Sequence, residues 1–186
     1  RRIIIKSCIA TILSSNHLAL AAKGETQFQK TPQQCGFNLI NLYNEKNITN
    51  FSEWDFKFMA DNGFTYARIP INYRVYTNPQ DWQKINSDFF FSHIDKAIEL
   101  GNKHNIHICL NLHRIPGYCI NRRNEEPYDL FDPNPDIREK ALSTASIHWS
   151  YISSRYKDVS PAKLSFNPIN EPPNFISQQS LEIYNS

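Results

Sequence analysis

Segments in which apolar and polar residues alternate are interspersed along this chain with segments in which apolar residues recur every three or four positions. The first pattern is typical of strands and the second is typical of helices. Alternating segments predict strands at residues 35–39, 65–71, 106–113 and 163–169. The helical spacing predicts helices at residues 50–62, 87–103 and 135–156. Strand and helix therefore take turns, which favours a parallel sheet with crossover helices.

The first predicted helix carries capping residues at both ends. Asn50, with Glu53 three positions later, can form a capping box, and Gly63 suits the position just after the helix. Three aromatic residues would lie along one face of this helix: Phe51, Trp54 and Phe58.

The stretch 114–134 has several prolines and no apolar period, so it predicts a long loop, a kind of segment that is often functional. Asn134 and Pro135 then provide a cap and a first-turn proline for the last helix. The acidic residues of the loop lie in no pattern that would fix their geometry, so none is nominated as a catalytic carboxylate: Glu125, Glu126 and Asp132.

The two faces of the strand at 106–113 differ, and this difference favours a barrel over a doubly wound sheet. The residues on one face are aliphatic and would face the helices. The residues on the other face would face a barrel interior: His107, Cys109, Asn111 and His113. No glycine-rich phosphate turn follows the first strand, which weakens a dinucleotide-binding fold. A full barrel takes about 250 residues, and this chain has 186. We therefore predict the α/β class and a (β/α)8 TIM barrel of which only about the first four β/α units are present.

Composition narrows the partners and the compartment. The net charge of +2 includes no basic block, so we expect no nucleic acid partner, and the 13% aromatic content suits ligands with flat apolar faces such as sugars. Residues 1–22 combine a basic start, a short apolar run and a small-residue site, which predicts a signal peptide followed by one domain at 23–186. A poorly ordered N-terminal tail is the alternative. With the signal peptide, the mature protein would be secreted or periplasmic, with no membrane partner.

Cysteine and histidine spacing indicates neither a disulfide scaffold nor a metal site. Cys35, Cys109 and Cys119 follow the leader, and no pair has C-x-x-C spacing. A bridge between Cys109 and Cys119 stays open. His107 and His113 lie at opposite ends of one strand, roughly 20 Å apart, too far to share an ion. We expect no metal and no other cofactor.

Polar residues at the ends of three predicted strands are the candidates for chemistry. Glu171 follows the last strand, where a carboxylic acid can protonate a leaving-group oxygen, and Asn170 beside it can bind a substrate hydroxyl. The alternative is that Asn170, Glu171 and Pro172 merely end a strand. Arg68 would point inward and, if buried, would need a carboxylate partner; the alternative is an ordinary surface ion pair. His113 ends its strand facing inward, where it could bind a hydroxyl.

Four aromatic residues on or near the predicted rim loops could stack on sugar rings, although at least half of them should be packing residues: Tyr73, Tyr76, Trp82 and Tyr118.

Three motifs, Arg68-Ile-Pro70, Asn111-Leu-His113-Arg-Ile-Pro-Gly117 and Asn170-Glu171-Pro172, together resemble glycoside hydrolase family 5 in order and spacing. The family comprises cellulase-type retaining glycosidases, and the likeness runs from about Gly36 onward over the N-terminal half of the catalytic domain. Pro168 departs from the aliphatic residue typical at its position, which suggests local distortion of the last strand.

The resemblance implies a role for each candidate residue. Glu171 would be the general acid/base, Asn170 would hold the 2-hydroxyl of the sugar, and Arg68 would orient the nucleophile. His113 would line the same sugar subsite. Tyr118 is a candidate for substrate binding because of its place on a rim loop. The nucleophile would be a Glu on a later strand, beyond residue 186, so we expect the 186 residues alone to be inactive.

The predicted activity is hydrolysis of O-glycosyl bonds in a β-linked glucan or related polysaccharide, by a retaining mechanism, with a polysaccharide or oligosaccharide as partner. One alternative is a truncated, inactive carbohydrate-binding remnant. Another is a different barrel enzyme, which the lack of a strand-end lysine or a convergent histidine cluster argues against.

Overall fold

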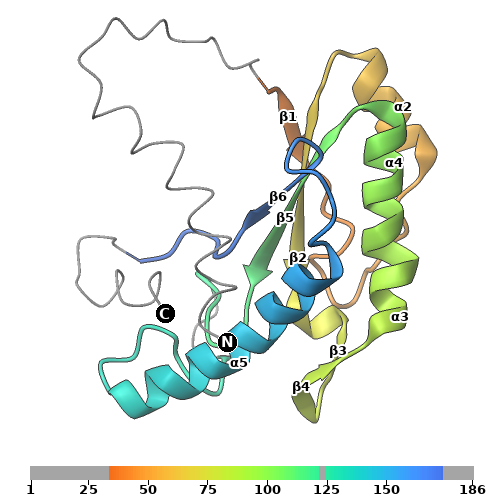
Figure 1. The fold of residues 1–186 in the computed structure, drawn as a ribbon. Helices are drawn as coiled ribbons and strands as arrows, with labels where there is room; N and C mark the ends of the chain where they lie inside the picture. Colours follow the sequence, from red (N-terminus) through yellow and green to blue (C-terminus); the bar gives the residue numbers. More distant parts are fainter. Residues whose placement is uncertain (1–33, 122–124, 174–186) are drawn as a thin grey trace, which may run out of the picture.

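The computed structural model describes residues 34–121 and 125–173. Four parallel strands form its main sheet in the order β1-β2-β5-β6. Their bounds are β1 Gly36–Asn38, β2 Tyr66–Asn72, β5 His107–Arg114 and β6 Leu164–Asn167. Each strand of this sheet pairs with the strand of the same sheet that follows it along the chain, which is the arrangement of successive barrel strands (Figure 1). The predicted signal peptide at 1–22 lies outside the described residues.

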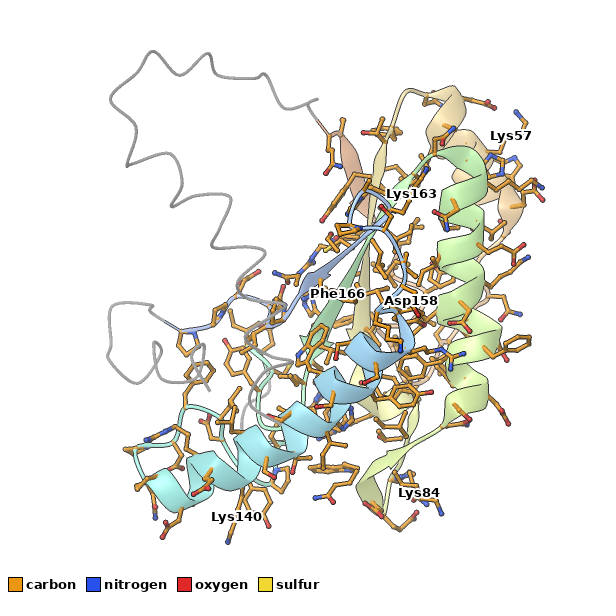
Figure 2. The ribbon with its side chains drawn as sticks, in the orientation of Figure 1. Lys57, Lys84, Lys140, Asp158, Lys163 and Phe166 are labelled. Atoms are coloured by element: carbon orange, nitrogen blue, oxygen red, sulfur yellow. The ribbon has the colours of Figure 1, made fainter. Side chains whose placement is uncertain are left out.

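Three helices connect these strands. They are α2 Glu53–Asp61, α4 Lys96–His104 and α5 Pro135–Arg155. Helices α2 and α4 lie side by side against one face of the sheet, and α5 runs obliquely below them (Figure 1). At the far edge, Phe166 of β6 packs edge-on against Trp149 of α5, with ring centroids 5.9 Å apart (Figure 2).

The connection between β2 and α4 is more elaborate than predicted. A short helix η2 (Tyr73–Val75) leads into an antiparallel hairpin of β3 (Thr77–Asn78) and β4 (Asp81–Ile85). The predicted helix at 87–103 exists but divides into α3 (Ser87–Phe89), a π-helical turn η3 (Phe90–Asp95) and α4. Sequence periodicity does not reveal a single π turn, because it shifts the apolar stripe by only one position.

The start of α2 differs from the prediction. Ser52 is the N-cap, and it forms a reciprocal capping box with Asp55, through bonds of 3.3 and 3.1 Å. Asn50 and Glu53 therefore do not cap this helix; Glu53 instead pairs with Lys103 of α4. Gly63 has a φ of 77°, as the predicted position after the helix requires.

The buried face of α2 also differs from the prediction. Phe56 and Met59 are its buried residues. Trp54 is 69% exposed and stacks on Phe58, which is also exposed, so these two aromatic rings lie away from the core. Phe51 is buried and meets Phe56 edge-on.

The core lies between the sheet and the helices, on the aliphatic parity predicted for the strand at 106–113. Ile108, Leu110 and Leu112 are each about 1% exposed, and each such side chain contributes roughly 1.5–3 kcal/mol of burial. Helix α4 approaches β5 closely at Gly101, where a Cβ would lie 2.7 Å from the Ile108 side chain. The two parities of the strand are therefore confirmed.

Strand β6 ends earlier than the predicted 163–169. Its ladder stops at Asn167, because Pro168 has no N–H to donate to a neighbouring strand. The Pro168 carbonyl accepts a 3.2 Å hydrogen bond from the indole of Trp149. The residues that follow, including Asn170 and Glu171, therefore need not adopt the extended backbone of a strand.

The cysteines of the described region are free: Cys35, Cys109 and Cys119. The bridge between Cys109 and Cys119 that the sequence left open does not form. Within residues 34–121 and 125–173, no helix is both long and apolar enough to cross a bilayer.

Candidate active site

The inward-facing residues of three neighbouring strands form a polar row near the carboxyl end of the sheet. The pairing register sets Pro70 beside Asn111, and Asn111 beside Asn167. The Asn111 amide donates to the side chain of Asn167 and, over 3.2 Å, to its backbone carbonyl. Because the strands are parallel, side chains of the same parity at their ends converge at one rim.

Arg68 joins this row to the segment that carries the acidic candidate. Its guanidinium donates to the side-chain oxygen of Asn170 over 2.7 Å and to those of Asn167 and Asn38 over 3.2 and 3.4 Å. The sequence predicted a carboxylate partner, but within the described region the hydrogen-bond partners of Arg68 are these amide oxygens. Amides satisfy the N–H groups without cancelling the positive charge.

Asn170 is held by this contact in a nearly closed environment. It is 4% exposed, and its Nδ2 is buried with no hydrogen-bond partner among residues 34–121 and 125–173. A buried donor left unsatisfied costs about 1–3 kcal/mol. The amide of Asn170 is thus the one side-chain group that this part of the chain buries without satisfying.

Glu171 follows with its side chain exposed and its backbone in the left-handed region, at a φ of 44°. That conformation costs a non-glycine residue on the order of 1 kcal/mol. The carbonyl of Glu171 accepts a 2.6 Å hydrogen bond from the hydroxyl of Tyr118, in the loop after β5. An unusual backbone conformation with a dedicated side-chain contact is typical of functional positions.

His113 lies close enough to Arg68 and Glu171 for both charges to act on it. Burial, and then the positive charge of Arg68, lower the pKa of His113, while the Glu171 carboxylate opposes them. The imidazole is therefore neutral at neutral pH. Its Nδ1 lies 3.1 Å from the side-chain oxygen of Asn111, so we assign the proton to Nδ1 and a free lone pair to Nε2. Tyr43 packs edge-on against the same ring.

The structure therefore brings together four of the residues singled out in the sequence: Arg68, His113, Asn170 and Glu171. They come from β2, from β5 and from the segment after β6. A carboxylic acid, an unpartnered amide, a neutral imidazole and a guanidinium can together transfer a proton and bind hydroxyl groups.

A second polar cluster, centred on Glu126, was not anticipated from the sequence. The Glu126 side chain is fully buried and accepts hydrogen bonds from Arg114 over 2.6 Å, from Tyr73 over 2.8 Å and from Arg74 over 3.2 Å. Glu125 lies beside it and pairs with Arg114 over 2.9 Å. The loop acids thus have a fixed geometry after all. One feature of the sequence could have indicated this cluster. Arg114 stands at the end of a buried strand, and a buried arginine needs an acidic partner.

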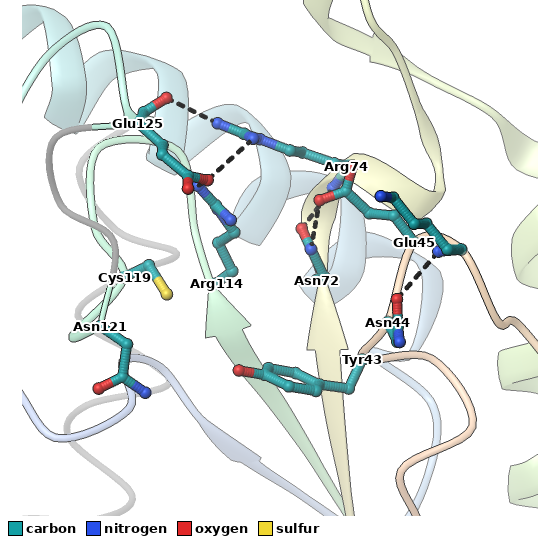
Figure 3. A pocket seen from close by; sticks show the side chains of 10 residues that line it. Tyr43, Asn44, Glu45, Asn72, Arg74, Arg114, Cys119, Asn121 and Glu125 are labelled. Carbon is teal, nitrogen blue, oxygen red and sulfur yellow. Dashed lines mark hydrogen bonds and ion pairs between the residues drawn. The ribbon is translucent and has the colours of Figure 1, made fainter.

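A cavity of about 520 Å³ opens beside Tyr43, the residue whose ring packs against His113 (Figure 3). Arg114 and Asn72, at the ends of β5 and β2, line the cavity together with Glu125, Arg74 and Glu45. Tyr43, whose ring is partly exposed, is an aromatic side chain of this cavity that the sequence analysis missed. The cavity extends the rim site toward the loop that follows β1.

The rim tyrosines do not offer their rings to a ligand as the sequence suggested. Tyr73, Tyr76 and Tyr118 are at most 2% exposed. Their hydroxyls contact Glu126, His148 and the Glu171 carbonyl. Trp82 packs edge-on against Tyr73. Tyr118 therefore supports Glu171 in this structure, and direct substrate contact by Tyr118 stays a prediction.

Metal-ligating side chains do not gather within the part of the chain that the structure describes. No group of three or more His, Cys, Asp or Glu residues there could hold a metal ion.

The family model described as Cellulase (glycosyl hydrolase family 5) matches residues 21–182 of this chain. Cellodextrinase A of Ruminococcus flavefaciens is 31% identical over 115 residues, which cover 61% of this chain and 32% of that protein. Endoglucanase C of Acetivibrio thermocellus is 28% identical over 109 residues, covering 58% of this chain and 29% of that protein. The chain thus spans about a third of the length of these curated relatives.

Solved structures of glycoside hydrolases are also similar to this chain. A crystal structure described as that of a glycoside hydrolase is 37% identical, with a TM-score of 0.68, over 78% of this chain and 44% of the other. The parallel sheet with its helices is part of the same fold, so the predicted partial (β/α)8 barrel is confirmed.

Proposed function

Because this chain belongs to glycosyl hydrolase family 5, we propose that the complete protein hydrolyses O-glycosyl bonds in a β-linked glucan or a related polysaccharide. The observation that carries the proposal is the 2.7 Å bond from Arg68 to Asn170, which holds the residue next to Glu171 against the polar row. Similarity to proteins named Cellodextrinase A and Endoglucanase C supports a glucan as the substrate.

Glu171 would act as general acid and then as general base. As the nucleophile attacks the anomeric carbon, Glu171 protonates the departing glycosidic oxygen, and a covalent glycosyl-enzyme forms. Glu171, now a carboxylate, then takes a proton from the water that attacks the same carbon and releases the sugar. Net retention of configuration follows from the two displacements.

The nucleophile would be a second carboxylate about 5–5.5 Å from the first. Glu125 and Glu126 are committed to Arg114 and Arg74, so they are poor candidates. We therefore propose neither of them as the nucleophile, and we assign that role to a Glu on a later strand of the complete barrel. Arg68, whose hydrogen-bond partners in the described region are neutral amides, retains a positive charge that can orient that carboxylate.

Asn170 and His113 would bind the sugar at the point of cleavage. The unpartnered Nδ2 of Asn170 is a ready donor to the sugar 2-hydroxyl. The neutral imidazole of His113 leaves Nε2 as an acceptor for a hydroxyl of the same sugar. Both interactions would orient the substrate without adding charge to the site.

The location of the protein outside the cytoplasm also remains a proposal, which rests on the signal-peptide pattern at residues 1–22. A polysaccharide substrate fits that compartment. The N-terminal residue of the protein recovered from its native host would test the cleavage.

The test of the proposed function is Glu171→Gln in the complete protein. The amide keeps the shape of the side chain but cannot transfer the proton, so release of reducing sugar from soluble β-glucans should fall by about 10²–10⁴-fold. Glu139→Gln, an equally conservative change at an exposed position on α5, should leave the rate unchanged. Undiminished turnover by Glu171→Gln, or no sugar release by the wild-type protein from any β-linked glycan, would contradict the proposal.

A further inference from the structure

The backbone of Glu171 has a conformation that this residue type rarely adopts without external support. Its φ of 44° lies in the left-handed region, and its side chain is exposed. Such conformations persist only where the surrounding structure imposes them. The contact that imposes this one comes from outside the segment, because the hydroxyl of Tyr118 donates to the Glu171 carbonyl over 2.6 Å.

We propose that Tyr118 is a positioning residue for Glu171, and this inference rests on the proposed function of Glu171. The hydroxyl of Tyr118 binds the backbone carbonyl of Glu171, and fixing that carbonyl fixes the direction in which the carboxyl group leaves the chain. Tyr118 would therefore act on the reaction through Glu171.

Tyr118 is itself firmly held. It is 2% exposed, and its ring meets the ring of Phe131 edge-on with centroids 5.0 Å apart. Its backbone closes a tight turn with Ile115 through two hydrogen bonds, of 2.9 and 3.1 Å. The turn fixes the backbone of Tyr118 and the contact with Phe131 fixes its ring. The hydroxyl on that ring is therefore a rigid support for the Glu171 carbonyl.

The buried Glu126 anchors the turn that carries Tyr118. Glu126 accepts from the backbone N–H of Gly117 over 3.4 Å and from Arg114 of β5 over 2.6 Å. Gly117 has a φ of 88°, and a Cβ there would lie 2.8 Å from the Cβ of Ala141 on α5. The support for Glu171 therefore begins at the end of β5 and runs through Glu126 and Gly117 to Tyr118.

Two separate contacts thus hold the consecutive residues Asn170 and Glu171. Arg68 holds the side chain of Asn170 from β2, and Tyr118 holds the backbone of Glu171 from the loop after β5. Without the hydroxyl of Tyr118, the left-handed conformation of Glu171 loses its hydrogen bond, and the carboxyl group can move away from the bond it protonates. A displacement of about 1 Å in a catalytic group can cost up to 10²-fold in rate.

The first test is Tyr118→Phe in the complete protein, because it removes the hydroxyl and keeps the buried ring. We expect kcat to fall by about 10-fold, KM to stay within about 2-fold, and the acid-base limb assigned to Glu171 to shift in the pH profile. Tyr128→Phe is the matched control: it lies in the same loop, its ring is exposed, and Lys140 lies over that ring. That variant should match the wild type in all three quantities. Glu126→Gln is less informative, because it can destabilise the whole loop.

A second readout does not depend on activity. Because the Glu171 carboxylate raises the pKa of His113 against burial and Arg68, the imidazole of His113 reports where that carboxylate lies. In an NMR titration of the histidine ring protons, Glu171→Gln should lower the pKa of His113. Tyr118→Phe should lower it in the same direction but less, and Tyr128→Phe should not change it. The loss of one signal in His113→Asn assigns the resonance.

A wild-type His113 titration in Tyr118→Phe would overturn the inference, whether or not kcat falls. A wild-type kcat in an active enzyme would also overturn it. If the wild-type protein cleaves no glycan, the proposed function fails, and the His113 titration alone then decides whether Tyr118 positions Glu171.

Discussion

Arg68 shows how single residues define this site. It binds three amide oxygens, from Asn38, Asn167 and Asn170, and each amide belongs to a different segment of the rim. A planar guanidinium can satisfy several acceptors in fixed directions, whereas the ammonium of a lysine is a compact point charge on a flexible stem. The identity of this residue, and not only its charge, therefore holds Asn170 in position.

Arg68→Lys should consequently weaken the proposed enzyme even though the charge is preserved. We expect kcat of the complete protein to fall by about 10–10²-fold, because Asn170 and Glu171 lose their alignment. Arg138→Lys, the same exchange in the first turns of α5, serves as the control and should leave kcat unchanged. Equal activity of Arg68→Lys and wild type would show that the guanidinium geometry has no part in catalysis.

The sequence predicted the members of this site because of their position along the strands. Arg68, His113 and Glu171 all stand near strand ends, and the carboxyl ends of parallel strands share one rim. What the sequence could not predict was which atoms meet. The bond from Arg68 to Asn170 joins residues 102 positions apart, and the bond from Tyr118 to the Glu171 carbonyl joins residues 53 positions apart. Local periodicity cannot predict contacts over such separations.

At the scale of elements, α5 and the β3–β4 hairpin are joined through a buried histidine. His148 of α5 is 0% exposed; its Nδ1 lies 2.9 Å from the hydroxyl of Tyr76, and its Nε2 lies 2.8 Å from the carbonyl of Trp82. With the proton on Nε2, the neutral ring donates to Trp82 and accepts from Tyr76. Burial lowers the pKa of His148 from 6.5 to about 4. The network therefore needs the neutral imidazole.

Stability should depend on pH through this residue. Above pH 6.5, His148 is neutral in both the folded and the unfolded states, so its full contribution is present. As pH falls from 6.5 toward 4, the unfolded state binds a proton and the folded state does not, which lowers the free energy of unfolding by up to about 3 kcal/mol. In urea titrations of the complete protein at pH 7 and pH 5, His148→Gln should lose less stability than the wild type over this range. Equal losses would contradict the assignment.

The sequence predicted the long strands and helices but missed a short hairpin, and the reason is physical. The strand at 106–113 and the last helix were found because long periodic segments bury one face. The β3–β4 hairpin was missed because its strands are short and its shape depends on packing against η2 and α5. The cap of α2 was misplaced by two residues, since both Asn50 and Ser52 precede an acidic residue by three positions.

At the scale of the whole molecule, the described sheet has two open edges. Strand β1 pairs only with β2, and β6 pairs only with β5, among the strands that the structure describes. Parallel sheets are normally covered on both faces, and unpaired edges recruit other strands. Apolar side chains accompany the β1 edge, with Ile40 66% exposed. A complete barrel would seal both edges, in keeping with the partial coverage of the similar glycoside hydrolase structure.

The 186-residue chain prepared alone should therefore self-associate. We expect light scattering after size exclusion to report oligomers or aggregates, and Ile40→Lys to reduce their proportion, because a charge beside an edge discourages strand pairing. A sharp monomer peak with cooperative unfolding would contradict this expectation.

Proton donation by Glu171 is the central claim, and a comparison of leaving groups tests it most directly. In the complete protein, kcat/KM for cleavage by the wild type and by Glu171→Gln would be measured on two aryl glycosides, one with a dinitrophenyl leaving group and one with an unactivated phenyl group. A dinitrophenolate leaves without protonation, so the variant should lose about 10²–10⁴-fold on the phenyl substrate and almost nothing on the dinitrophenyl substrate. Equal losses on both substrates, or no loss on either, would show that Glu171 is not the proton donor.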